Sequence, residues 1–413
     1  MRIYLNDMLY ALSYALDCVE AEYLGAKAYH SERVAYICVR LGKACGLGDT
    51  ALLKLAAAAV LHDNALTEYV SQRKKDGQYT YMAHEKMENP LPASLQPHCE
   101  MGERNVQVLP FYEDIQGAVL YHHEHADGSG AFGKEAADTP LFAQLIHLGD
   151  QLDNRFPLNH IDEPIRVCIR QYLQQNAGHL FCPDLVEPLL DVFDMPAVGE
   201  LQDSGVRQLL QQELPHIPME CSPVEIEGLA TVFARIIDYK SHFTCMHSLG
   251  IAQKAQRLGR YLGKSEELCT KLYLAGALHD IGKLTISNDI LEKPGRLTAA
   301  EFDIVKTHAM ATWNILQHLE GLDDVIEWAS LHHEKLDGSG YPFGRTAGEM
   351  GMEVRLMACI DIYQALIEAR PYKEGMTHVQ AVKILQEMAE DGLLDRELVR
   401  DIDHCFAMSE EGI

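Results

Sequence analysis

The two halves of this 413-residue chain carry the same sparse pattern of histidine and aspartate residues. A His-Asp pair at 62–63 recurs at 279–280, an offset of 217 residues. After a net seven-residue change in spacing, the letters His-His-Glu at 122–124 recur at 332–334, an offset of 210 residues. The copies have otherwise diverged widely, so these shared residues stand out. A repeat on this scale predicts two copies of one domain in a single chain.

The repeat also sets the domain boundaries that the sequence predicts. We expect the first copy over residues 1–197, a connector over 198–221 and the second copy over 222–413. The letters Ser-Pro-Val-Glu at 222–225 form a capping box with proline at the first helical position, which is typical of a helix start. At roughly 100–200 residues per domain, the length of the chain agrees with this division.

Apolar residues mostly recur at the three- and four-residue spacing of an α-helix, as they do over 249–262, and strand patterns are sparse. Thr298 and Glu301 form a second capping box. Asp49 is placed to cap a helix that leads toward His62. We therefore predict an all-α protein of two tandem helical bundles, joined by a short helical or irregular connector.

The composition excludes several classes of protein. With 61 acidic against 35 basic residues the net charge is −26, which argues against a nucleic-acid polymer as partner. The 11 cysteines form no C-x-x-C pair, so neither a disulfide framework nor a zinc ribbon is indicated. Neither a signal peptide nor an apolar run of the roughly 18 residues that span a bilayer is predicted, so we expect a cytoplasmic protein. The 20 histidines remain unexplained by these considerations.

Each copy holds the same seven candidate metal ligands, five histidines and two aspartates. In the second copy they are His247, His279, Asp280, His308, His332, His333 and Asp361. In the first copy they are His30, His62, Asp63, His98, His122, His123 and Asp150. A single histidine on an apolar helix is usually a core residue, but the recurrence of the whole set in order argues for ligands. Seven imidazole and carboxylate ligands exceed the needs of one first-row ion and predict two ions, bridged in the second copy by Asp280.

The second copy resembles an HD-GYP domain, the phosphodiesterase branch of the HD metal-dependent phosphohydrolase superfamily. The shared motifs are HS at 247–248, HDIGK at 279–283, ILEKPGRLT at 290–298, KTH at 306–308, HHEKLDGSGYP at 332–342 and DIYQALIEARPYK at 361–373. The match covers nearly all of 222–413. The resemblance implies that a metal-bridging hydroxide hydrolyses the 3'-5' phosphodiester bond of cyclic di-GMP, giving linear pGpG, GMP or both.

The candidate catalytic residues are His279, Asp280 and Lys283. Metal ions held by the first two would activate water and neutralise phosphoryl charge. Lys283, expected one helical turn beyond His279 on the same face, could reach the phosphate or the leaving oxygen. The candidate substrate-binding residues are Gly340, Tyr341, Pro342, Arg370 and Lys373. The glycine turn allows close backbone approach and the aromatic ring can stack on a base, while by analogy with the family the two cations pair with the phosphates.

Two departures from the family pattern bear on the metal site. The usual D-x-x-D motif has Gln364 in place of its second acid, from which we expect tuning of the site without loss of metal. Members with three metal ions carry a glutamate four residues before the first histidine, and here that residue is Phe243. We therefore predict two divalent ions in the second copy, with Fe or Mn favoured and Zn or Ni compatible.

The first copy keeps its ligands but lacks the other elements of the site. Leu66 stands at the position of Lys283, and Ala131 at that of Tyr341. Because unpaired imidazoles and carboxylates tolerate burial poorly, we expect this site to hold metal and to be regulatory or active on another phosphate. The alternative is a structural remnant.

Three functions stay open. The favoured one is a cyclic di-GMP phosphodiesterase with catalysis in the second copy. A phosphodiesterase for another cyclic dinucleotide, such as cyclic GMP-AMP, would use the same phosphate chemistry. A non-hydrolysing receptor or scaffold is the third, although the intact His-Asp pair at 279–280 and Lys283 argue against it. A homodimer or a signalling partner protein is compatible with all three.

Overall fold

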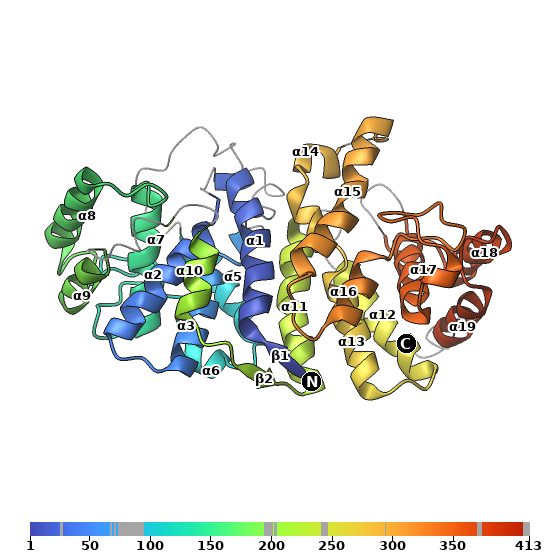
Figure 1. Cartoon of the computed structure of the whole chain (residues 1–413), viewed down its shortest axis with the longest axis horizontal. Coiled ribbons are helices and arrows are strands. Elements are labelled where there is room, and N and C mark those ends of the chain that lie inside the picture. The colour runs from blue at the N-terminus through green and yellow to red at the C-terminus, as the bar shows by residue number, and fades with distance from the viewer. Residues whose placement is uncertain are drawn as a thin grey trace. The chain divides into compact units, whose positions relative to one another are not determined.

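The part of the chain that the structure describes is mostly helical, as the spacing of its apolar residues predicts (Figure 1). The computed structural model describes residues 1–24, 28–66, 68–69, 72, 95–193, 201, 205–240, 247–293, 295–369 and 374–407. Within these ranges the only sheet pairs two short strands, β1 (Arg2–Tyr4) and β2 (Pro218–Glu220). The all-α prediction is confirmed. None of the helices in these ranges is long and apolar enough to cross a membrane.

The chain divides into two compact units, an N-terminal unit over Tyr4–Met219 and a C-terminal unit over Glu220–Ile413. The first three residues of the chain belong to the C-terminal unit. There the amino group of Met1 donates a hydrogen bond to the carbonyl of Cys221 at 2.7 Å, and the amide of Cys221 donates to the carbonyl of Met1 at 2.8 Å.

The N-terminal unit is a bundle built around one buried helix, α2. Its helices are α1 (Leu5–Leu24), α2 (His30–Ala44), α3 (Asp49–Val60), α5 (Gln96–Val106), α6 (Tyr112–Ile115), α7 (Leu141–Arg155), α8 (Glu163–Asn176), α9 (Pro183–Phe193) and α10 (Val206–Glu213). Helix α2 packs against α3, α7 and α10. The predicted cap of α3 is wrong by one residue, because Asp49 is the first helical residue and Gly48, which has no side chain, occupies the cap.

Helix α10 lies in the segment that the sequence predicts as a connector. It packs against α2 and is tied to it by ion pairs. The carboxylate of Glu213 accepts a hydrogen bond from Nζ of Lys43 at 2.6 Å and forms an ion pair with Arg40. This part of the predicted connector is therefore a fixed helix of the N-terminal unit.

The C-terminal unit is also a bundle of helices. Its helices are α11 (Pro223–Lys240), α12 (His247–Tyr261), α13 (Glu266–Leu278), η4 (Ile281–Thr285), α14 (Asn288–Leu291), α15 (Ala299–Leu316), α16 (Asp323–Ser330), η5 (Ala347–Glu349), α17 (Met352–Ile367), α18 (His378–Glu390) and α19 (Arg396–Ala407). Both predicted capping boxes are confirmed, since the amides of Ser222 and Thr298 each donate to the glutamate three residues later at 2.7 Å.

Helices α12 and α13 form the centre of the C-terminal unit, and small residues set their distance. A Cβ atom added to Gly276 would lie 2.7 Å from Cα of Ala252. The glycine therefore lets the two backbones touch. This contact brings the start of α12, at His247, close to the end of α13, at His279.

Candidate functional site

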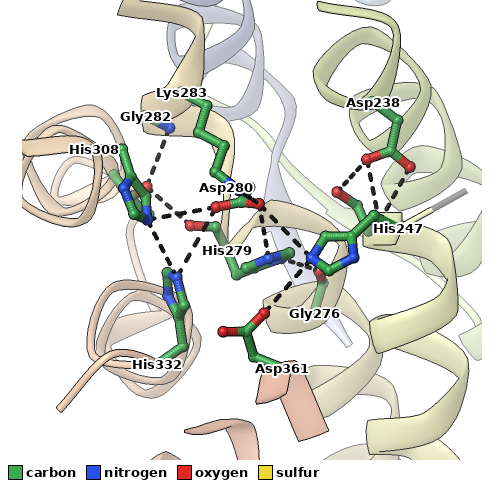
Figure 2. A network of polar contacts seen from close by, with 12 residues as sticks. Asp238, His247, Gly276, His279, Asp280, Gly282, Lys283, His308, His332 and Asp361 are labelled. Carbon is green, nitrogen blue, oxygen red and sulfur yellow. Dashed lines mark hydrogen bonds and ion pairs between the residues drawn. The ribbon is translucent and has the colours of Figure 1, made fainter. Parts of the chain in front are cut away.

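The His279–Asp280 pair lies where the α-helical backbone of α13 changes to the 3-10 helix η4. His279 caps the end of α13, and Asp280 precedes the first residue of η4. Lys283 therefore follows Asp280 by one turn of a 3-10 helix, and does not continue the helix of His279 as the sequence predicts. Its ammonium group forms an ion pair with Oδ2 of Asp280 (Figure 2).

A glycine at position 282 lets this turn pack directly against α15. A Cβ atom on Gly282 would lie 2.0 Å from the carbonyl oxygen of His308, so no other residue fits. The amide of Gly282 donates to Oγ1 of Thr312 at 3.1 Å, and this hydroxyl donates to the carbonyl of His279 at 3.0 Å. The helix that carries His308 is thereby held to the His-Asp turn.

Three histidines of this site share one orientation. In each, Nδ1 lies within hydrogen-bond distance of the carbonyl three residues earlier. The pairs are His279 with Gly276 at 2.8 Å, His308 with Val305 at 2.7 Å and His332 with Ala329 at 2.7 Å. Because a carbonyl only accepts, Nδ1 carries the proton and Nε2 presents a lone pair. This is the tautomer in which imidazole binds a metal through Nε2.

Two carboxylates lie between two groups of imidazoles (Figure 2). The first group is His247 and His279, and the second is His308, His332 and His333. Oδ2 of Asp280 is 3.1 Å from Nε2 of His279, and its Oδ1 is 3.5 Å from Nε2 of His308. Asp361 places Oδ1 3.5 Å from Nε2 of His247 and Oδ2 3.5 Å from Nδ1 of His333. Each carboxylate thus offers one oxygen to each group.

Some buried polar atoms at this centre have no hydrogen-bond partner, which bears on whether metal ions fit it. Nε2 of His279 and Oδ1 of Asp280 are shielded from solvent and have no hydrogen-bond partner. Leaving such atoms unpaired costs free energy, and a divalent cation would satisfy both. Two groups of ligands with carboxylates between them fit a pair of ions. Phe243, on which the predicted count of two depends, lies outside the described residues.

The ionisation of the site also suits cations. Burial lowers the pKa of His308 to about 3 and that of His332 well below its usual value, so both rings are neutral at pH 7. Burial acts to raise the pKa of the Asp280 carboxyl, but the neighbouring His279 ring and the charge of Lys283 hold it well below its usual range. His308 and His332 are therefore neutral imidazoles, and Asp280 is an ionised carboxylate.

His247 is oriented by an acid that the sequence analysis missed. Nδ1 of His247 lies 2.7 Å from Oε2 of Glu368, at the end of α17. Burial acts to lower the pKa of His247, but its hydrogen bonds with Asp361 and Glu368 raise it to about 9. Glu368 thus aims Nε2 of His247 at the centre.

In the first copy the acid that orients the equivalent histidine comes from a different position of the helix. There Asp153, at the position of Gln364, accepts a hydrogen bond from Nδ1 of His30 at 2.7 Å and pairs with the buried Arg33. The counterpart of Arg33 in the second copy is Gly250, where a Cβ atom would lie 2.6 Å from Nε2 of Gln364. An Arg-Asp pair has therefore been exchanged for a Gly-Gln pair, and the glutamate at the end of α17 supplies the acid instead.

We expect Glu368→Gln to weaken metal binding at the C-terminal site by about 10- to 100-fold. The neutral amide of glutamine would replace the charged carboxylate that accepts a hydrogen bond from Nδ1 of His247. Competition with a chromogenic chelator measures the affinity. Glu353→Gln is the matched control, since Glu353 lies on the same helix and pairs with Lys264 at 3.3 Å. Equal affinities for the two variants would contradict the role given to Glu368.

The seven candidate ligands of the first copy also converge. Oδ1 of Asp63 lies 3.5 Å from Nε2 of His98 and 3.6 Å from Nε2 of His122, and Oδ1 of Asp150 lies 3.4 Å from Nε2 of His30. Oδ1 of Asp63 and Nε2 of His122 are buried without a hydrogen-bond partner. The donor set of this copy therefore fits divalent ions as well.

The glutamate after each His-His pair shapes the following loop. Glu334 accepts from the amides of Phe343 at 2.7 Å and Arg345 at 3.0 Å, and Glu124 holds the corresponding loop of the first copy. A Cβ atom on Gly340 would lie 2.5 Å from Cα of Glu334. Gly340 therefore has a structural role in the loop, and its contact with substrate stays a prediction.

Tyr341 projects from this loop onto the candidate ligand histidines. Its ring centroid is 4.7 Å from that of His333 and 6.3 Å from that of His308. The side chain is partly buried and lies at the rim of the candidate metal centre, and Pro342 follows it in the loop. The predicted phosphate contacts Arg370 and Lys373 lie outside the described residues.

Comparisons with known proteins agree with this arrangement. Models of the HD domain match residues 28–155 and 231–398. A 3'3'-cGAMP-specific phosphodiesterase of Vibrio cholerae is 29% identical over 98% of this chain and 93% of its own length. A second phosphodiesterase of this specificity from the same organism is 32% identical over 71% of this chain and 63% of its own. A cyclic di-GMP phosphodiesterase of Pseudomonas aeruginosa is 35% identical over 57% of this chain and 55% of its own.

The fold is also found among solved structures. A cyclic GMP-AMP-specific phosphodiesterase of Vibrio cholerae superposes with a TM-score of 0.64 at 24% identity, over 99% of each chain. Both HD-domain matches contain the repeated His-Asp pair, at 62–63 and 279–280. The chain belongs to the HD domain family and carries one HD domain in each half.

Proposed function

We propose that this chain is a metal-dependent phosphodiesterase that hydrolyses a cyclic dinucleotide in its C-terminal HD domain. The observation that carries the proposal is the position of Lys283, whose ammonium group contacts the carboxylate that lies between the two imidazole groups. Tyr341 adds an aromatic face at the rim of the same centre. The first copy has Leu66 and Ala131 at these positions, so we assign hydrolysis to the C-terminal domain alone.

The residues of this site divide the work of phosphodiester hydrolysis. Divalent ions, when bound by the imidazoles and carboxylates, supply Lewis acidity that activates water and neutralises charge on the phosphoryl oxygens. Lys283 places a donor where it can bind a phosphoryl oxygen or the leaving ribose oxygen. Tyr341 offers a surface on which a base can stack, which orients the phosphate relative to the ligands.

We propose 3'3'-cyclic GMP-AMP as the preferred substrate, although the sequence analysis favoured cyclic di-GMP. The support is the length of the similarity: a 3'3'-cGAMP-specific relative aligns over 98% of the chain, whereas the cyclic di-GMP phosphodiesterase of Pseudomonas aeruginosa aligns over 57%. Metal ligands and Lys283 recognise the phosphates that both dinucleotides share, so base contacts decide the preference.

A competition assay tests the function and the preference together. The protein is reconstituted anaerobically with Fe(II) or Mn(II) and given equal amounts of the two dinucleotides, and the linear products are separated by chromatography. We expect hydrolysis of both with faster loss of 3'3'-cyclic GMP-AMP. Faster loss of cyclic di-GMP would overturn the substrate preference only. Tight binding without any product would support the receptor alternative and overturn the enzyme.

We expect Lys283→Ala to lower kcat by about 100-fold while the metal content stays unchanged, because it removes a charged donor from the developing phosphoryl charge. Lys271→Ala is the control, since Lys271 lies on α13 and pairs with Asp324 at 2.7 Å. Steady-state kinetics with elemental analysis of both variants measures the effect. A kcat equal to that of the control would remove Lys283 from the mechanism.

A further inference from the structure

The N-terminal centre contains a ligand atom that has no counterpart in the C-terminal centre. Sγ of Cys99 lies 3.6 Å from Nε2 of His98, and the thiol is fully buried. The ligand atoms of Cys99, His98, His122 and His123 all lie within 4.8 Å of one another. The corresponding residue of the second copy, directly after His308, is Ala309.

We propose that Cys99 is a metal ligand and that the N-terminal HD domain holds a thiolate-bound ion of the Zn²⁺ class. A tetrahedral zinc ion with Zn–N near 2.0 Å and Zn–S near 2.3 Å separates its nitrogen and sulfur ligands by about 3.5 Å. The separation of Cys99 Sγ and His98 Nε2, 3.6 Å, matches this value. Nε2 of His122, buried and without a hydrogen-bond partner, is an independent observation that favours a cation at the same place.

The thiol closes the coordination sphere. Three imidazoles and one thiolate already satisfy a four-coordinate ion, and Oδ1 of Asp63, 3.5 Å from Nε2 of His98, can supply a fifth ligand. Such a sphere has no open position for a reacting water, in agreement with Leu66 and Ala131 at the positions of the lysine and tyrosine of the C-terminal site. The ion bound by Cys99 would therefore have a structural or regulatory role.

Sulfur also changes which ion is preferred. Thiolate is a soft ligand that selects zinc over iron or manganese, whereas the described candidate ligands of the C-terminal centre are all nitrogen and oxygen. One chain would thus hold two different kinds of ion. This inference stands apart from hydrolysis in the C-terminal domain.

Cobalt substitution of the full-length chain tests the proposal. A Co²⁺ ion bound by thiolate absorbs in the near ultraviolet through sulfur-to-metal charge transfer, and nitrogen and oxygen ligands give no such band. We expect the band with an intensity equal to one thiolate per chain. Cys99→Ala should abolish it, and because alanine occupies the equivalent buried position at 309 the substitution suits the site. Cys38→Ala, which removes a buried thiol bonded to the carbonyl of Leu145, should leave it unchanged.

Zinc affinity gives a second measurement on the same chains. Cys99→Ser should weaken the binding of one zinc ion by roughly tenfold or more, as measured by chelator competition, while Cys38→Ala keeps the native affinity. A band that survives in Cys99→Ala, a cobalt-loaded native chain without a band, or an N-terminal centre that binds no ion would each overturn the proposal. A chain that shows the band but hydrolyses no cyclic dinucleotide would overturn the proposed function alone.

Discussion

Replacing His279 and Asp280 together by alanine is expected to lower hydrolysis by at least about 1000-fold, equivalent to roughly 4 kcal/mol of transition-state stabilisation. Asp280 offers its oxygens to both imidazole groups, at 3.1 Å from His279 and 3.5 Å from His308. Its loss therefore removes a ligand from each group and also the partner of Lys283. Turnover of the cyclic dinucleotide and metal content per chain are the quantities to measure.

The duplication supplies a matched control for this experiment. His62→Ala with Asp63→Ala makes the same change at the equivalent position of the N-terminal domain. We expect most of the turnover to remain, because that domain lacks the lysine and the tyrosine. Circular dichroism of both double variants checks that the helical fold is kept, and Asp280→Asn tests the charge with the smallest change of shape. Equal loss of turnover in the two double variants would show that catalysis depends on both domains.

The helical fold could be predicted because it follows from local sequence patterns, and the candidate ligands because they recur in both copies. The capping boxes at Ser222 and Thr298 require only a residue and its third neighbour, and both form. The cap predicted for Asp49 failed by one residue because Gly48 fits the same backbone position without a side chain. The candidate ligand histidines stood out because they are present in both copies while their neighbours differ.

Contacts that depend on pairs of residues from different helices could not be predicted. In the second copy Gly282 makes room for α15, whose Thr312 binds the His-Asp turn. In the first copy Ala65 replaces that glycine and Gly102 replaces the threonine, so the small residue has moved to the opposite helix. Close packing requires the sum of the two side chains to fit, and a linear pattern does not show which residues share that space. The transfer of the acid to Glu368 escaped prediction for the same reason.

Removal of divalent ions is expected to lower the thermal stability of both domains. An ion that binds the folded chain and not the unfolded one stabilises it by about 2.7 kcal/mol when its free concentration is 100 times Kd. For domains of this length that corresponds to a decrease in Tm of roughly 5–10 °C on chelation. The buried unpaired atoms of Asp63, His122, His279 and Asp280 are the groups whose desolvation the ions would offset.

Calorimetry of the full chain over a series of free zinc and manganese concentrations measures this stabilisation. Tm should rise with the logarithm of the free ion concentration, since the binding free energy adds directly to the free energy of unfolding. Two variants separate the domains: the double change at 279–280 should abolish the dependence on manganese, and Cys99→Ser should weaken the dependence on zinc, because the thiol of Cys99 makes only the N-terminal centre soft. A Tm that is independent of both ions would show that hydrogen bonds, and not metals, satisfy these buried groups.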